Sequence, residues 1–219
     1  MGIADRGAGP ILSGMTSSAR FAELRTAAPD IVLAWDGIDA EQFLSVRREV
    51  RRRTGPGTAA RIVPQLAVTG EALAAIIRTL PEVAFAMPGG EEDWTVAQAV
   101  GHAADARAGL AMAASLAAQG RFPADAPEVI PGIPGPADVT RDHLLRRLET
   151  SQRIVERAAR AIAGHEVTEC PLDHRRVGRL RCGEWLLFAG VHDLMHLEQL
   201  EALATALATG PATEPATAR

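Results

Sequence analysis

The sequence predicts an all-α protein, a four-helix bundle with an N-terminal helical extension. Three observations indicate this fold class. Alanine and leucine dominate the 219 residues, aromatic residues make up only 4% of them, and the alternation of apolar and β-branched residues that marks strands is nearly absent. The length suits one main domain with a substantial core. We expect the extension over residues 1–58, the bundle over residues 59–209 and a disordered tail over residues 210–219.

Composition and charge exclude several classes of protein. All 23 basic residues are arginine, which excludes Schiff-base enzymes and the usual P-loop, because both need a lysine amine. The net charge of -4 argues against a dedicated nucleic-acid-binding protein. No apolar run stands out as long enough to span a membrane, and the N-terminus lacks the pattern of a signal peptide. We therefore expect a soluble, cytoplasmic protein that binds neither nucleic acid nor membranes.

Two further features of the composition bear on the origin and the redox state of the protein. Lysine, asparagine and tyrosine are all absent, and these three amino acids share AT-rich codons, so the coding genome is expected to be GC-rich and bacterial. Two cysteines, Cys170 and Cys182, are too few for a disulfide scaffold. They could pair if oxidised, but in a cytoplasmic protein we expect them to be free packing residues.

The extension is predicted to contain two helices. Residues 1 to about 18 are rich in glycine, serine and alanine without any period and are expected to be loose. One helix is predicted over residues 21–28, where a proline ends it, and a second over residues 40–53. The basic run at residues 47–53 could be a nucleic-acid contact or a solvated helix face. We expect the solvated face, because the chain is acidic as a whole. Residues 54–58, TGPGT, form a linker.

The first two helices of the bundle have clear boundaries. The first is predicted from residue 59 or 64 to residue 80, where a proline follows. The second is predicted over residues 96–119. Its start carries a capping box, because Thr95 can cap the helix and Gln98 stands three residues further on.

Two connections and two helices complete the bundle. Residues 121–139 contain five prolines and cannot form regular structure, so we expect either a partial lid over the end of the bundle or a plain crossover between helices. The third helix is predicted over residues 141–163. After it comes an extended excursion or a small hairpin, and the fourth helix opens after Gly183 and closes at Gly210.

The fourth helix carries the chemistry. His192 and His196 are four residues apart, so both rings emerge from one face of a mostly apolar helix, which is a spacing typical of metal ligands. Gln199 lies on the same stripe and can orient a ligand or a substrate. The alternative is that the two histidines are ordinary core residues. A third histidine, His102, lies among alanines on the second helix, so three imidazoles can converge on a site for Zn, Ni, Fe or Cu.

Two segments of the chain resemble the signature segments of the DinB/YfiT-like superfamily. They are DWTVAQAVGHAADA at residues 93–106 and GEWLLFAGVHDLMHLEQL at residues 183–200, and the resemblance covers roughly residues 60–208. That superfamily includes the mycothiol-dependent maleylpyruvate isomerases and the bacillithiol and mycothiol S-transferases. The resemblance implies a four-helix bundle with His102, His192 and His196 as the ligands of one metal ion.

The resemblance implies a metal-dependent transferase that activates a low-molecular-weight thiol for transfer to a small electrophile, or for thiol-assisted isomerisation. A GC-rich genome favours mycothiol as the thiol. Zn, Ni or Fe would fit the three histidines. An anionic substrate could bind Arg107, or three arginines before or at the start of the last helix, namely Arg176, Arg179 and Arg181; surface charge is the alternative for each.

Two other functions remain open from the sequence. The segment HDLMHLE is similar to the iron-binding stretch of the ergothioneine-type sulfoxide synthases, which suggests an oxygen-dependent iron enzyme. Those enzymes need a second domain for which this chain has no room. The third possibility is a metal-stabilised bundle that binds a small molecule or a partner without catalysis. A homodimer is compatible with any of the three.

Overall fold

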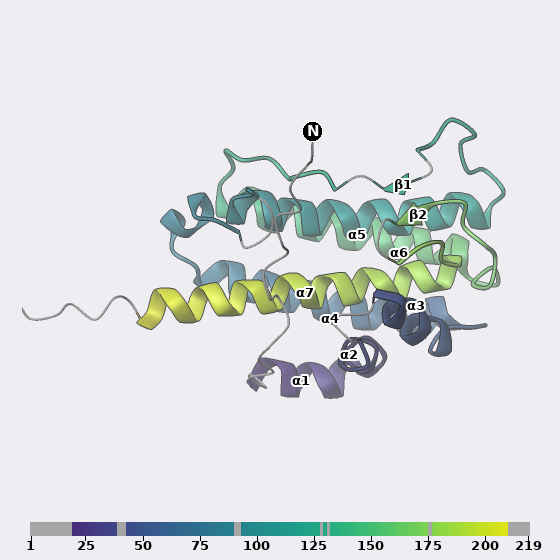
Figure 1. Cartoon of the computed structure of the whole chain (residues 1–219), viewed down its shortest axis with the longest axis horizontal. Coiled ribbons are helices and arrows are strands. Elements are labelled where there is room, and N and C mark those ends of the chain that lie inside the picture. Colours follow the sequence, from purple (N-terminus) through teal and green to yellow (C-terminus); the bar gives the residue numbers. More distant parts are fainter. Residues whose placement is uncertain are drawn as a thin grey trace, which may run out of the picture.

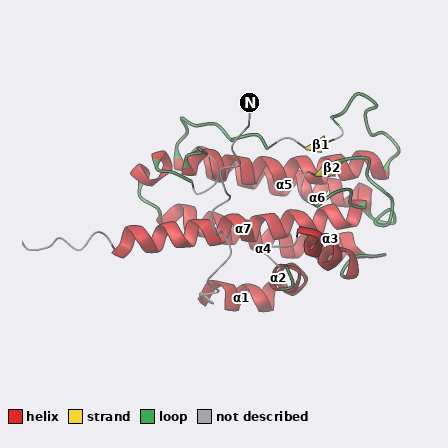
Figure 2. Cartoon of the chain, in the orientation of Figure 1, coloured by secondary structure: helices red, strands yellow, loops and turns green. Residues whose placement is uncertain are grey.

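The computed structural model describes residues 19–38, 43–89, 93–127, 129–130, 132–174 and 177–209. Helices make up most of this part of the chain (Figure 2), which confirms the all-α fold class. The predictions of a loose N-terminal start and a disordered tail concern residues 1–18 and 210–219. Both lie outside the described residues.

Four long helices form the bundle, and each lies within a few residues of its predicted range. They are α4 (Thr58–Thr79), α5 (Val96–Ala118), α6 (Arg141–Ile162) and α7 (Cys182–Thr209). Helices α5 and α6 run in one direction, and α4 and α7 run in the other (Figure 1). The segment between α5 and α6 therefore returns along the length of α5. It is the crossover that the sequence left as one of two possibilities.

The start of α5 is set by the predicted capping box. The hydroxyl of Thr95 accepts a hydrogen bond from the backbone N–H of Gln98 at 3.3 Å, and the side-chain oxygen of Gln98 accepts one from the N–H of Thr95 at 2.9 Å. Two N–H groups that the helix itself leaves unpaired are thereby satisfied. This start places His102 on the second turn of α5.

Helix α4 is long and apolar enough, by length and composition alone, to cross a membrane. This corrects the expectation that no segment of the chain reaches that length. In the fold α4 packs against α6 and α7, and its Ile62, Leu66 and Ile77 side chains are fully buried in the common core. Such packing is typical of the core helix of a soluble protein.

The extension is part of the same core as the bundle. It forms α1 (Ala19–Ala27), α2 (Pro29–Asp36) and α3 (Phe43–Arg52), which lie along α4 and α7 (Figure 1). The first helix ends before Pro29 as predicted, but that proline also opens α2, which the sequence analysis did not anticipate. A proline fits the first turn of a helix, where its missing N–H would have no helical partner. The second predicted helix, over residues 40–53, corresponds to α3. Its first predicted residues, 40–42, lie outside the described residues.

The connections hold short extended pieces. A 3-10 turn, η1 (Glu82–Ala86), follows α4. Strand β1 (Val129–Ile130) in the crossover pairs in parallel with β2 (Asp173–His174), which lies between α6 and α7. The segment before α7 also folds back on itself through an antiparallel bridge, in line with the predicted hairpin. Cys170 and Cys182 at its two ends are both buried and free. The β1–β2 pairing was not predicted.

A close approach of α2 and α7 attaches the extension to the bundle. A Cβ atom added at Gly190 would lie 2.4 Å from Cδ1 of Ile31, and the Ile31 side chain is fully buried. We therefore expect Gly190→Ala to lower the free energy of unfolding by about 1–3 kcal/mol, because the buried isoleucine must move away. Urea unfolding followed by circular dichroism measures this loss.

Gly109 is the matched control, since it lies in α5 and a Cβ atom there would meet nothing within 4 Å. Gly109→Ala should stabilise the protein by roughly 0.5–1 kcal/mol through helix propensity. The double variant Gly190→Ala with Ile31→Ala should lose less than the sum of its two single variants. Equal effects of alanine at the two glycines would contradict the close contact.

Candidate metal centre

Three imidazole rings from two helices meet inside the bundle. His102 comes from α5, and His192 and His196 come from consecutive turns of α7. The centroid of the His102 ring is 5.1 Å from that of His192 and 5.6 Å from that of His196, and the two rings of α7 are 4.6 Å apart. One nitrogen atom of each ring lies within 4.8 Å of one nitrogen of each of the others. The structure thus brings together the three histidines that the sequence singled out.

Hydrogen bonds to two of the rings determine which nitrogen faces the cluster. Nδ1 of His102 lies 2.8 Å from the carbonyl oxygen of Ile133, and Nδ1 of His196 lies 2.9 Å from Oε1 of Gln199. Both partners are acceptors, so each Nδ1 carries the proton and each Nε2 keeps its lone pair. Histidine ligands of metals are usually oriented in this way by an acceptor on the other nitrogen. Gln199, expected to orient a ligand or substrate, contacts a ligand candidate directly.

Burial keeps the two rings of α7 uncharged. His196 is only 2% exposed, and this burial, reinforced by His102, lowers its pKa to about 4. Burial also lowers the pKa of His192 well below its usual value, and the neighbouring histidines add to this effect. At neutral pH both rings are therefore neutral, which is the form that binds a metal.

The residues fit a metal ion. Nδ1 of His192 and Nε2 of His196 are buried and have no hydrogen-bond partner. Buried polar atoms nearly always have a partner, so these two nitrogens lack something that a cation would supply. Nitrogen ligands at about 2.1 Å from one tetrahedral ion lie roughly 3.4 Å apart, so small side-chain adjustments bring the cluster to ligating distances. The three-histidine group can hold a metal ion.

Aromatic side chains surround the cluster. The ring of Trp94 lies 4.9 Å from that of His102, and the ring of Phe188 lies 6.4 Å from that of His192. Phe188 also contacts His174 of β2, with ring centroids 5.3 Å apart. His174 is only partly exposed, and its charge contributes to the lowered pKa of His192. No local pattern could have revealed this, because β2 approaches α7 only in the folded chain.

The crossover between α5 and α6 forms one wall beside the histidines. A Cβ atom at Gly135 would lie 2.6 Å from Cα of Gly101, and the Gly135 N–H donates to the Gln98 carbonyl at 3.0 Å. Two glycines therefore let the crossover lie directly on the backbone of α5, next to His102. This contact also places the Ile133 carbonyl oxygen within hydrogen-bonding distance of Nδ1 of His102. The crossover therefore runs along α5 and touches it closely at Gly135.

Arg107 has a different environment from the one expected. Its side chain is fully buried, and its guanidinium group binds Asp193, the carbonyl oxygen of Leu66 at 2.9 Å and Oε1 of Gln152 at 2.5 Å. Asp193 is also fully buried and accepts a second hydrogen bond, at 2.7 Å, from Thr69. The suggestion that Arg107 binds an anionic substrate is not supported by this placement. Asp193 is a residue that the sequence analysis missed.

The protonation state of Asp193 suits this ion pair. Burial raises the pKa of its carboxyl group to about 6, and Arg107 and Thr69 oppose the rise. At neutral pH the carboxylate is therefore largely ionised and pairs with Arg107. The pair joins α5 to α7, and Thr69 joins α4 to the same point. Because Asp193 follows His192, the pair sets the rotation of α7 about its axis.

The other arginines proposed as substrate contacts lie away from the histidines. Arg179 and Arg181 immediately precede α7, about ten residues or roughly 15 Å along the helix from His192. Arg176 lies outside the described residues. The structure therefore brings none of the described arginine candidates to the three rings.

Asp193→Ala should destabilise the protein by about 3–5 kcal/mol, because it leaves the Arg107 guanidinium buried without a counter-charge. The double variant Arg107→Met with Asp193→Leu should lose clearly less, since no buried charge remains. Asp105→Ala is the control, because Asp105 and its partner Arg147 are both partly exposed, and its cost should not exceed about 1 kcal/mol. The free energies of unfolding are measured by urea unfolding. Equal losses in Asp193→Ala and Asp105→Ala would contradict a buried ion pair between Arg107 and Asp193.

Acid should destabilise the metal-free protein through His196. Its pKa is about 4 in the folded state and 6.5 in the unfolded chain. Between these two pH values the unfolded chain binds a proton at this ring and the folded chain does not. The contribution of His196 to the free energy of unfolding of chelator-treated protein should therefore fall over that window by on the order of 3 kcal/mol. The lowered pKa of His192 acts in the same direction and the raised pKa of Asp193 in the opposite one, so the share of His196 is the difference between the wild-type and His196→Gln profiles, each measured by urea unfolding at every pH. Substituting the exposed His165 in the same way should leave the wild-type profile unchanged.

Comparison with known proteins agrees with the arrangement of helices and histidines. The sequence profile described as the DinB superfamily matches residues 65–200, which is more than half of the chain and includes all three histidines. Neither a curated protein nor a solved structure matches the chain significantly. The chain belongs to the DinB superfamily.

Proposed function

We propose that the protein is a metal-dependent transferase that activates a low-molecular-weight thiol at the three-histidine centre. The observation that carries the proposal is the pair of buried, unpartnered nitrogens on His192 and His196 opposite the oriented ring of His102. Three protein ligands leave further coordination positions open, and open positions are typical of catalytic metal sites. Membership of the DinB superfamily supports a metal-dependent enzyme but does not specify the reaction.

The chain itself supplies ligands, orientation and partial exclusion of water. A divalent metal bound here would lower the pKa of a thiol and so supply a thiolate at neutral pH. Gln199 and the Ile133 carbonyl hold two of the rings in their ligating tautomers. Trp94, which is partly exposed, provides apolar surface for a reactant close to the rings, and the buried Phe188 packs beside His192.

In the proposed reaction the thiol sulfur forms a bond to carbon of a small electrophile. The leaving group departs with the electron pair of the bond it gives up, and the thiol proton passes to solvent. In the isomerase variant the sulfur adds to an unsaturated acid and is later expelled, so that no group is transferred overall. The rate enhancement comes from activation and proximity, with no protein nucleophile. The GC-rich coding bias favours mycothiol as the thiol.

Substitution of His196 tests the centre. Purified wild-type protein should contain about one Zn, Ni or Fe per chain by elemental analysis, and His196→Ala should lose it, because only two ring ligands remain. Helical content by circular dichroism should stay mostly intact, since the many buried apolar side chains of α7 are unchanged. His165→Ala, in the exposed loop after α6, should keep the metal.

Turnover then separates the possible functions. The metal-loaded protein is screened with mycothiol and other low-molecular-weight thiols against small electrophiles, and thiol loss is followed by colorimetry. Thiol consumption that disappears in His196→Ala supports the transferase. Iron content with oxygen uptake would instead identify an oxygen-dependent enzyme. Metal binding that raises stability without either reaction would indicate a non-catalytic binding bundle.

A further inference from the structure

A pocket lined mainly by arginine lies near the N-terminal end of α7. Its volume is about 160 Å³, and its walls come from α3 and from the hairpin before α7. Helix α3 lies beside the start of α7 (Figure 1). The lining residues are Arg47, Arg51, Glu169, Arg179, Leu180 and Arg181.

The carboxylates at this pocket leave most of its arginines without a counter-charge. Glu184, 1% exposed, is engaged by Arg51 through two hydrogen bonds of 2.8 and 3.2 Å, and it also accepts the backbone N–H of Arg181. Arg47, Arg179 and Arg181 form no ion pair within the described part of the chain. Among the described residues of the lining Glu169 is the one acidic residue, and Oδ1 of Asp173 lies 3.9 Å from the Gly178 Cβ position that NH1 of Arg47 also approaches. The pocket therefore carries an excess of positive charge although the whole chain is acidic.

The four arginines line one concave region, and one of them, Arg51, is anchored by a buried carboxylate. Arg51 is fixed by the buried Glu184, and NH1 of Arg47 lies 3.4 Å from the position of a Cβ atom at Gly178. Nε of Arg181 is buried and has no hydrogen-bond partner. Guanidinium groups bind oxyanions through paired N–H donors, and several of them around one cavity suit a group with several negative oxygens.

The pocket is separate from the metal centre and combines two parts of the chain. About ten residues of α7, or roughly 15 Å, separate Arg181 from His192. Arg47 and Arg51 precede the part of the chain that matches the DinB superfamily, whereas Arg179 and Arg181 lie within it. Attachment of the extension to the bundle is therefore what completes the pocket.

We propose that this pocket binds a small phosphate-type oxyanion, either inorganic phosphate or the phosphate group of a small molecule. A volume of about 160 Å³ accommodates one such group, whereas a nucleic acid would need an extended basic surface. The net charge of -4 also disfavours a nucleic acid. The proposal does not depend on the reaction at the histidines.

Isothermal titration calorimetry of the full-length, metal-containing protein with inorganic phosphate, pyrophosphate and glycerol phosphate tests the proposal at constant ionic strength. We expect saturable binding of one anion per chain. Arg47→Gln and Arg179→Gln should each raise Kd by about tenfold, because each removes a charged donor that supports no ion pair of the fold. Tighter binding of glycerol phosphate than of phosphate would identify an organic phosphate as the ligand; the reverse order would identify the free anion.

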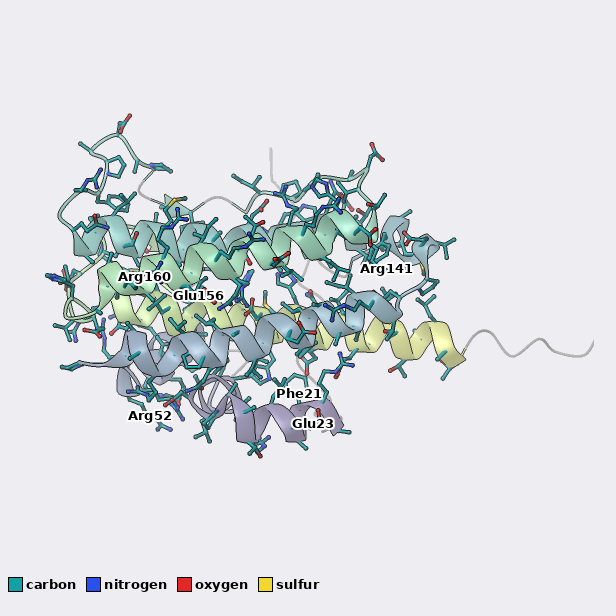
Figure 3. All side chains as sticks on the ribbon, turned by 180° about the vertical axis from the view of Figure 1, so that it is seen from behind. Phe21, Glu23, Arg52, Arg141, Glu156 and Arg160 are labelled. Atoms are coloured by element: carbon teal, nitrogen blue, oxygen red, sulfur yellow. The ribbon has the colours of Figure 1, made fainter. Side chains whose placement is uncertain are left out.

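Arg52→Gln is the matched control. Arg52 lies on the same helix (Figure 3), pairs with Glu49 at 3.2 Å and is not part of the pocket lining. The Arg52→Gln substitution removes the same charge as the other two but should change Kd less than twofold. Arg47→Gln, Arg179→Gln and Arg52→Gln should all keep the metal content of the wild type. Equal weakening by Arg52→Gln and Arg47→Gln, or no saturable binding of any phosphate, overturns the proposal. So does an oligonucleotide that binds while phosphate fails to compete.

Discussion

The buried ion pair between Arg107 and Asp193 is the interaction on which the arrangement of this protein depends. It joins the middle of α5 to α7, and Thr69 of α4 donates to the same carboxylate. An unpaired charge in this position would be costly, so the pair admits only one rotation and one register of α7 against its neighbours. Because Asp193 lies between the two histidines of α7, that register also directs both rings toward His102.

Around this fixed frame, the connections complete the metal centre. The crossover lies on α5 through the contact of Gly135 with Gly101, and its Ile133 carbonyl selects the tautomer of His102. The segment between α6 and α7 brings His174 and Phe188 together near His192. Helices thus supply the ligands, whereas connections determine their orientation and their surroundings. A change in the crossover can therefore alter metal binding without touching a ligand.

The extension has a structural role that follows from one close contact. Ile31 packs against Gly190, so α2 lies directly on the helix that carries two of the histidines. The same attachment brings α3 to the start of α7, where buried Glu184 holds Arg51. Apolar side chains from α1, α2 and α3 are buried in the same hydrophobic core as those of the bundle.

Local patterns in the sequence determined the helices and the ligand candidates. Apolar periodicity, the Thr95 capping box and the spacing of His192 and His196 depend on neighbours along the chain, so they were readable without coordinates. Only the tertiary structure decided the burial of Arg107, the approach of His174 and the orientation of His102 by Ile133. Each of these joins residues far apart in sequence, and their pairing depends on how the helices pack.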